Sequence, residues 1–130
     1  MADAANKSPI EGFSGWNEVR SAIEAIISSQ AEVFDPNTIA NARDVVSVCE
    51  SLTRLPAGVG KGYLTTVCLW WKGNFELDCL CWDGFELEVF EDRVEVYAFR
   101  DKATYIRHEE HTPGGSLTPR FLDELAALAR

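Results

Sequence analysis

The chain has 130 residues, of which 46% are hydrophobic, and a net charge of −9 from 21 acidic and 12 basic side chains. This length predicts one domain that buries a core without metals or disulfides, and this hydrophobic content excludes a disordered tail. The charge excludes a general binder of nucleic-acid phosphates and favours a basic partner. Because the N-terminus has no signal-peptide pattern and no run reaches the length of a membrane span, we expect a cytoplasmic protein whose four cysteines remain thiols.

Two helices are predicted after a flexible lead-in at residues 1–13. Ser14 is positioned to cap the first helix, because its hydroxyl can accept from first-turn amides. Asp35 followed by Pro36 is the start signal of the second helix. Both segments carry an apolar stripe at helical spacing. The stripes consist of Trp16, Val19, Ile23, Ile26 and Ile27, and of Ile39, Ala42, Val46, Cys49 and Leu52.

Four consecutive antiparallel strands follow, because four runs rich in aromatic and branched residues are separated by turn residues. The runs cover residues 63–71, 75–81, 85–90 and 93–99. Turns are expected within residues 72–74, 82–84 and 91–92, with Gly84 in a left-handed conformation. Alternation then defines an inner, apolar face. It would carry Leu64, Thr66, Cys68, Trp70, Phe75, Leu77, Cys79, Cys81, Phe85, Leu87, Val89, Val94, Val96 and Ala98.

The outer face of this sheet is predicted to gather negative charge. Alternation places Asp78 opposite Glu88 and Glu88 opposite Glu95, with Glu76 and Glu86 close by. Like charges directly opposite each other cost a few tenths to about 1 kcal/mol per pair, so a sheet that needed only solubility would do better with mixed signs. The row is therefore a candidate interaction surface. A solvated face that is merely rich in Glu stays open as the alternative.

The remaining chain completes an α+β fold. Residues 104–109 are predicted as a fifth strand, and Thr118 with Pro119 marks the start of a last helix. The predicted architecture is a four- to five-stranded antiparallel meander with two N-terminal helices and one C-terminal helix packed on one face. A single domain over residues 14–130 is expected.

No catalytic residue, resident metal or cofactor is predicted, because no arrangement of Ser-His-Asp or Cys-His is recognisable from spacing. Neighbouring strands are about 4.8 Å apart, so a divalent cation across the carboxylate row is one open alternative. That alternative would make the protein a small metal- or ligand-binding enzyme using Asp78, Glu88, Glu95 and His108. A second alternative is a structural homodimer formed through the apolar corner around Leu69 and Trp71.

Several short motifs give the chain a family resemblance over residues 50–100. They are Leu55-Pro56, Leu69-Trp70-Trp71 with Gly73, the Phe-Glu-Leu-Glu-Val run at 85–89 and the Arg-Val-Glu-Val-Tyr run at 93–97. In these motifs the chain resembles small uncharacterised α+β proteins of bacteria, phages and mobile elements. The resemblance implies the fold and a context of phage–host or toxin–immunity conflict, and it carries over no functional residue.

The leading hypothesis is a non-enzymatic inhibitor or immunity-type protein. It would occlude a basic surface of a nuclease or nucleic-acid-binding assembly, as anti-CRISPR proteins do, without touching nucleic acid or membrane itself. Acidic residues would steer association while aromatic anchors supply affinity. The expected contact residues are Asp78, Glu86, Glu88, Glu95, Trp71, Trp82 and Tyr97.

Overall fold

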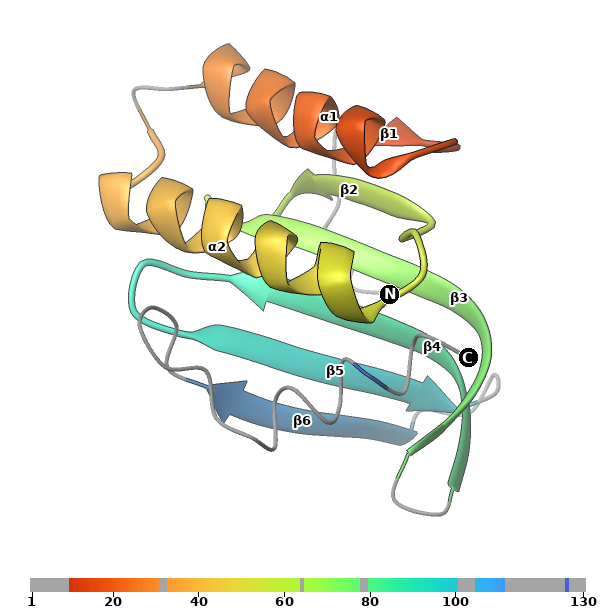
Figure 1. Cartoon of the computed structure of the whole chain (residues 1–130). Coiled ribbons are helices and arrows are strands. Elements are labelled where there is room, and N and C mark those ends of the chain that lie inside the picture. The colour runs from red at the N-terminus through yellow and green to blue at the C-terminus, as the bar shows by residue number, and fades with distance from the viewer. Residues whose placement is uncertain are drawn as a thin grey trace.

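The computed structural model describes residues 10–30, 33–63, 65–77, 80–100, 105–111 and 126. Over these ranges the protein is α+β, with two helices and one antiparallel sheet (Figure 1). The first nine residues of the predicted lead-in lie outside the described residues. Apart from residue 126, so does the predicted C-terminal helix. None of the helices in the described part is long and apolar enough to cross a membrane.

The two helices are α1 (Trp16–Ser29) and α2 (Pro36–Leu52). Helix α2 begins as predicted, because the Asp35 side chain accepts a hydrogen bond from the Asn37 amide at 2.7 Å. The cap predicted for α1 is wrong: Gly15 occupies that position, and the Ser14 hydroxyl donates instead to Glu18. Both apolar stripes contribute buried side chains to one core, which confirms the helix faces.

The strands pair in sequence order, so the predicted meander is confirmed, but its described strands number six rather than four or five. They are β1 (Ile10–Glu11), β2 (Gly58–Lys61), β3 (Val67–Leu77), β4 (Leu80–Val89), β5 (Val94–Arg100) and β6 (Tyr105–His111). The additional strands β1 and β2 come from segments predicted as lead-in and connector. β2 pairs with β3 and β1 pairs with β2, so the two strands extend the sheet toward α1 (Figure 1).

One long hairpin, β3–β4, replaces the two hairpins predicted between residues 63 and 90. Lys72 pairs with Gly84 and Phe75 with Trp82, so residues 72–75 contain a β-bulge rather than a turn. Gly73 has a φ of +105°. The prediction of a left-handed Gly84 is wrong, because its φ is not positive. The two predicted turns therefore lie opposite each other in one ladder, and Gly73 lies within the bulge. The predicted turn at residues 91–92 is confirmed.

This change of register moves the β3 side chains to opposite faces. Val67, Leu69 and Trp71 pair with Val89, Leu87 and Phe85 and join the core with both helices. Cys68 and Trp70 instead pair with Glu88 and Glu86 on the other face. We call this second face, which carries Glu86, Glu88 and Glu95, the acidic face. The β3 side chains predicted as outer are therefore core, and those predicted as inner share the acidic face.

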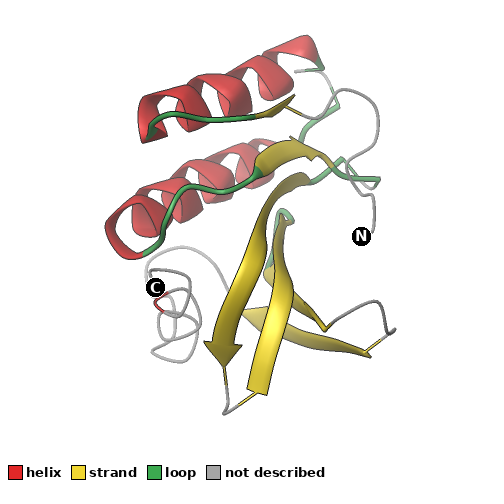
Figure 2. Cartoon of the chain, turned by 90° about the vertical axis from the view of Figure 1, so that its right-hand side faces the viewer, coloured by secondary structure: helices red, strands yellow, loops and turns green. Residues whose placement is uncertain are grey.

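The far half of the β3–β4 hairpin is a two-stranded ribbon. Among the described strands, β2 pairs with β3 only over Val67–Trp70, and β5 pairs with β4 only over Gly84–Val89. Beyond the pair of Lys72 and Gly84, residues 73–77 and 80–83 therefore have no third strand beside them among the described strands. Figure 2 shows this segment, which we call the ribbon, running away from the two helices.

Candidate functional site

The acidic face is built by the alternation of β4 and β5. Glu86 and Glu88 alternate with core residues along β4, and Glu88 lies directly opposite Glu95 on β5, as predicted. These carboxylates are not presented to solvent: Glu86 is 1% exposed and Glu95 8%, while Glu88 is half-buried. The site is therefore an interior cluster of acids rather than an open acidic surface.

The predicted row of Asp78, Glu88 and Glu95 is wrong in its pairing of Asp78 with Glu88. The β3 residue opposite Glu88 is Cys68, not Asp78. Asp78 itself lies outside the described residues. The prediction failed because it placed a turn at residues 72–74, whereas β3 continues to Leu77. Only the cross-strand pair of Glu88 and Glu95 remains from the row.

Donors from the same molecule hold both members of this pair. The Thr66 hydroxyl donates to Glu88 Oε2 at 2.6 Å. Arg93 Nε donates to Glu95 Oε2 at 2.7 Å, and the Tyr97 hydroxyl donates to Glu95 Oε1 at 2.5 Å. Glu95 thus has a cation and a phenol as partners, while the Thr66 donor to Glu88 is a neutral hydroxyl. Such bonds fix carboxylates inside a fold and do not offer them to a partner.

The connection between β2 and β3 closes over Glu88. The Gly62 amide donates to the Thr66 carbonyl at 2.7 Å. A Cβ at Gly62 would lie 1.9 Å from Thr66 Oγ1 and 2.9 Å from Glu88 Oε2, so only glycine fits this close approach. Sequence reasoning missed Thr66 and Gly62, because the mistaken register turned Thr66 toward the opposite face.

Burial shifts the pKa values of Glu88 and Tyr97 away from their ordinary values. Burial raises the pKa of Glu88, and the neighbouring Glu95 raises it further, against the lowering effects of the Thr66 hydrogen bond and of Arg93. Burial also raises the pKa of Tyr97, and its hydrogen bond to Glu95 adds to this. Tyr97 therefore stays protonated and acts as a donor.

The structure does not support a metal centre here. Within the described residues, no group of three or more His, Cys, Asp or Glu side chains is positioned to hold an ion. The prediction of thiols is confirmed for Cys49, Cys68 and Cys81, whereas Cys79 lies outside the described residues. Burial raises the pKa of the Cys49 thiol to about 12, so this cysteine is not a nucleophile.

Two of the predicted aromatic anchors are interior residues. Trp71 and Trp82 are each 1% exposed and belong to the hydrophobic core. The Trp71 indole donates to the Arg54 carbonyl at 2.9 Å and meets Phe85 edge-on. Neither tryptophan presents its ring to a partner. The large exposed aromatic residue of the described part is Tyr63, which is 84% exposed beside the β2–β3 connection.

Exposed charge is nonetheless strongly unbalanced among the described residues. The exposed acids number nine and the exposed bases two. The acids are Glu11, Glu18, Asp35, Asp44, Glu50, Glu76, Asp83, Glu91 and Asp92, and the bases are Arg43 and Lys72. The ribbon carries Glu76 and Asp83 from this set. The exposed acids are distributed over the helices, the ribbon and the β4–β5 turn and are not gathered on the predicted face.

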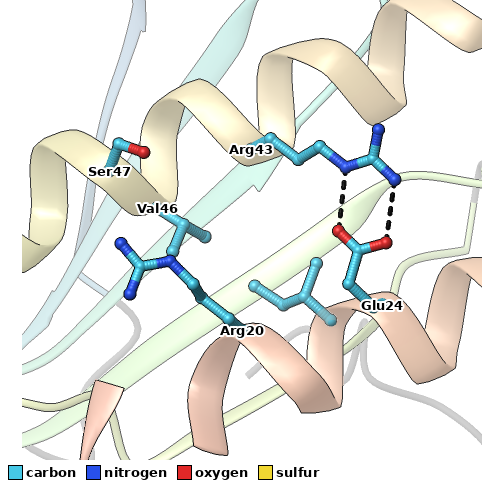
Figure 3. Close-up of a pocket in the computed structure, with 6 residues that line it drawn as sticks. Arg20, Glu24, Arg43, Val46 and Ser47 are labelled. Atoms are coloured by element: carbon cyan, nitrogen blue, oxygen red, sulfur yellow. Dashed lines mark hydrogen bonds and ion pairs between the residues drawn. The ribbon is translucent and has the colours of Figure 1, made fainter. Parts of the chain in front are cut away.

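A hollow of about 260 Å³ lies between α1 and α2. Figure 3 shows Arg20 and Glu24 of α1 facing Arg43, Val46 and Ser47 of α2 across it. Arg43 makes two hydrogen bonds of 2.8 Å to Glu24, and Arg20 pairs with Glu50. Because both arginines are engaged by glutamates, the hollow is the seam of a helix pair and not an anion site.

Comparison with known proteins adds no relative. No family model, no curated protein sequence and no solved structure matches this chain.

Proposed function

We propose that this protein is a non-enzymatic, acidic binding protein that occludes a basic surface of a nuclease or nucleic-acid-binding assembly. The excess of nine exposed acids over two exposed bases in the described part supports this proposal. Such a surface attracts basic partners and repels nucleic acid. The pair of Glu88 and Glu95 is not part of the proposed contact, because Glu95 is buried and both carboxylates accept hydrogen bonds from the same molecule.

The ribbon is the contact element that the geometry favours. It extends past the flanking strands and places Glu76 and Asp83 at exposed positions. A narrow two-stranded ribbon can enter a groove of a partner protein. The rest of the domain would then cover that groove. The ribbon residue Trp82 is buried in the hydrophobic core, whereas Glu76 and Asp83 are exposed.

Electrostatics would act mainly on the rate of association. Complementary charge steers encounter and raises the association rate constant, and salt weakens this effect because exposed charges are screened. Occlusion then needs no chemistry from the inhibitor, since a bound protein excludes nucleic acid by occupying its surface. The proposal therefore accounts for a charged exterior without a catalytic constellation.

The test is affinity capture from the cells that encode the protein, at low and high salt, with two matched variants. Glu76→Lys with Asp83→Lys reverses the ribbon, and Glu91→Lys with Asp92→Lys reverses the β4–β5 turn by the same charge. We expect a basic, salt-released partner to be retained by wild type and by the turn variant and lost by the ribbon variant. Equal retention by both variants would contradict the ribbon assignment, and the lack of any saturable basic partner would contradict the function.

A further inference from the structure

The ribbon leaves the sheet at an irregularity in the backbone of β3. The ladder register shifts between Lys72 and Phe75, and Gly73 within this bulge has a φ of +105°, which favours glycine. A bulge bends the strand that contains it and increases its local twist. Beyond the pair of Lys72 and Gly84, no described strand lies beside the ribbon. Contacts at this base can therefore set the direction in which the ribbon extends (Figure 2).

The segment that follows α2 runs along β3 toward this base. The amide of Thr53, the C-cap of α2, donates to the Cys49 carbonyl at 2.7 Å. Further along the segment, the Ala57 amide donates to the Trp70 carbonyl of β3 at 2.7 Å. Residues 53–57 thus connect the last turn of α2 to β3 immediately before the ribbon.

Arg54 contacts β3 through both its backbone and its side chain. Its carbonyl accepts a hydrogen bond from the Trp71 indole at 2.9 Å, and its guanidinium Nη2 donates to the Lys72 carbonyl at 3.2 Å. A Cβ built at Gly73 would lie 3.5 Å from Nη2, so the guanidinium lies against the bulge. Trp71 is buried in the core. Arg54 therefore joins a fixed point of the core to the base of the ribbon.

We propose that Arg54 is a positioning residue of the ribbon. It holds the bulge at Lys72 and Gly73 against the segment that follows α2, and it thereby fixes the direction in which the ribbon presents Glu76 and Asp83. The hold on the ribbon follows from the contacts of Arg54 itself, whereas its effect on a partner rests on the proposed function.

Arginine suits this role because its planar guanidinium presents several donors at the end of a long side chain. An element that is already held in its bound direction loses less conformational freedom on association, so positioning raises affinity. The charge of Arg54 acts in the opposite sense, since removing a base makes an acidic protein more attractive to a basic partner. A lower affinity without Arg54 would therefore report positioning and not charge.

The first experiment is hydrogen exchange of single backbone amides in the full chain, followed by NMR. Arg54→Gln should accelerate exchange of the protected amides at residues 73–77 and 80–83 by about two- to tenfold, as expected for the loss of one hydrogen bond, and leave those of α1 and α2 unchanged. Arg54→Lys keeps a donor and should restore part of the protection. Arg43→Gln removes the same charge from the exposed pair with Glu24 and should leave the ribbon as in wild type.

The second experiment measures capture of the salt-released basic partner by the same variants. We expect Arg54→Gln to bind it about two- to tenfold more weakly than wild type, although the net charge of this variant is more negative. Arg43→Gln carries the same net charge and should bind the partner at least as well as wild type.

Unchanged exchange of the ribbon in Arg54→Gln, or equal acceleration throughout the chain, would overturn the hold of Arg54 on the ribbon. A ribbon without protected amides in wild type would do the same. Faster ribbon exchange with undiminished capture would overturn the effect of Arg54 on the partner. If wild type captures no basic partner, the proposed function fails, while the exchange rates still decide whether Arg54 positions the ribbon.

Discussion

Two groups of glutamates in this molecule have pKa values that are shifted in opposite directions. At the seam between α1 and α2, Glu24 and Glu50 are paired with Arg43 and Arg20, and these hydrogen bonds lower the pKa of both acids. On the acidic face, burial raises the pKa of Glu88, which faces another carboxylate. The seam has one arginine for each glutamate and is exposed, whereas Glu86 and Glu95 of the acidic face are buried and Glu88 is half-buried.

This difference shows that the number of acids in a segment does not reveal what the acids do. A count along residues 76–95 finds eight acids and one base, which suggests a charged surface. The structure divides this set into exposed acids such as Glu76 and Asp83 and buried acids such as Glu86. Only the first kind can steer a partner, because a buried carboxylate is not presented to one.

The largest expected effect tests which aromatic residues are interior. Trp71→Ala removes an indole that is buried between the sheet and the helices and that bonds to the Arg54 carbonyl, so we expect a loss of about 4 kcal/mol in the free energy of unfolding. Tyr63→Ala, at the most exposed aromatic position described, should change it by less than about 0.5 kcal/mol. Urea denaturation measures both, and similar losses for the two variants would contradict the register of β3.

The register of β3 marks the limit of what the sequence alone could predict. Helical spacing and the Asp35-Pro36 signal sufficed for both helices, and alternation sufficed for residues 85–99 and the turn at 91–92. Turn residues at 72–74 and 82–84 were misleading, because glycine serves a bulge and a turn equally well. The resulting shift by one residue exchanged the faces of β3. Burial of Glu86 depends on tertiary packing, for which local pattern gives no signal.

The next largest effect on the free energy of unfolding should distinguish Arg93 on the acidic face from Arg43 at the helix seam. Arg93→Met leaves the buried Glu95 without its guanidinium partner, and we expect a loss of about 1–2 kcal/mol, reduced from the value for a fully buried pair because Arg93 is partly exposed. Arg43→Met breaks an exposed pair of equally good geometry and should be hard to distinguish from wild type. Thermal and urea unfolding near neutral pH measure the difference. Equal losses would show that burial does not distinguish the two regions.

The smallest expected effect concerns the decline of stability at low pH. Arg43 lowers the pKa of Glu24, so its contribution is present above the unfolded value of 4.5 and is lost as the pH falls through the folded pKa. Glu24→Gln should therefore make the decline of stability below pH 4.5 slightly shallower, and this is measured by urea unfolding between pH 2.5 and 5. The effect is small because the pair is exposed to solvent.

The pKa of Glu88 is raised in the folded state, so its contribution is complete below the unfolded value of 4.5 and is lost as the pH rises through the folded pKa. Glu88→Gln should leave the decline of stability below pH 4.5 in place and reduce the decline above pH 4.5, since Glu24 pairs with Arg43 and Glu88 with Thr66. In the double variant the two changes should add, as expected for independent sites. A change of the decline above pH 4.5 by Glu24→Gln would mean that the helix seam and the acidic face titrate as one system. Additivity would instead show that a single small fold holds two independent proton-linked regions with opposite signs.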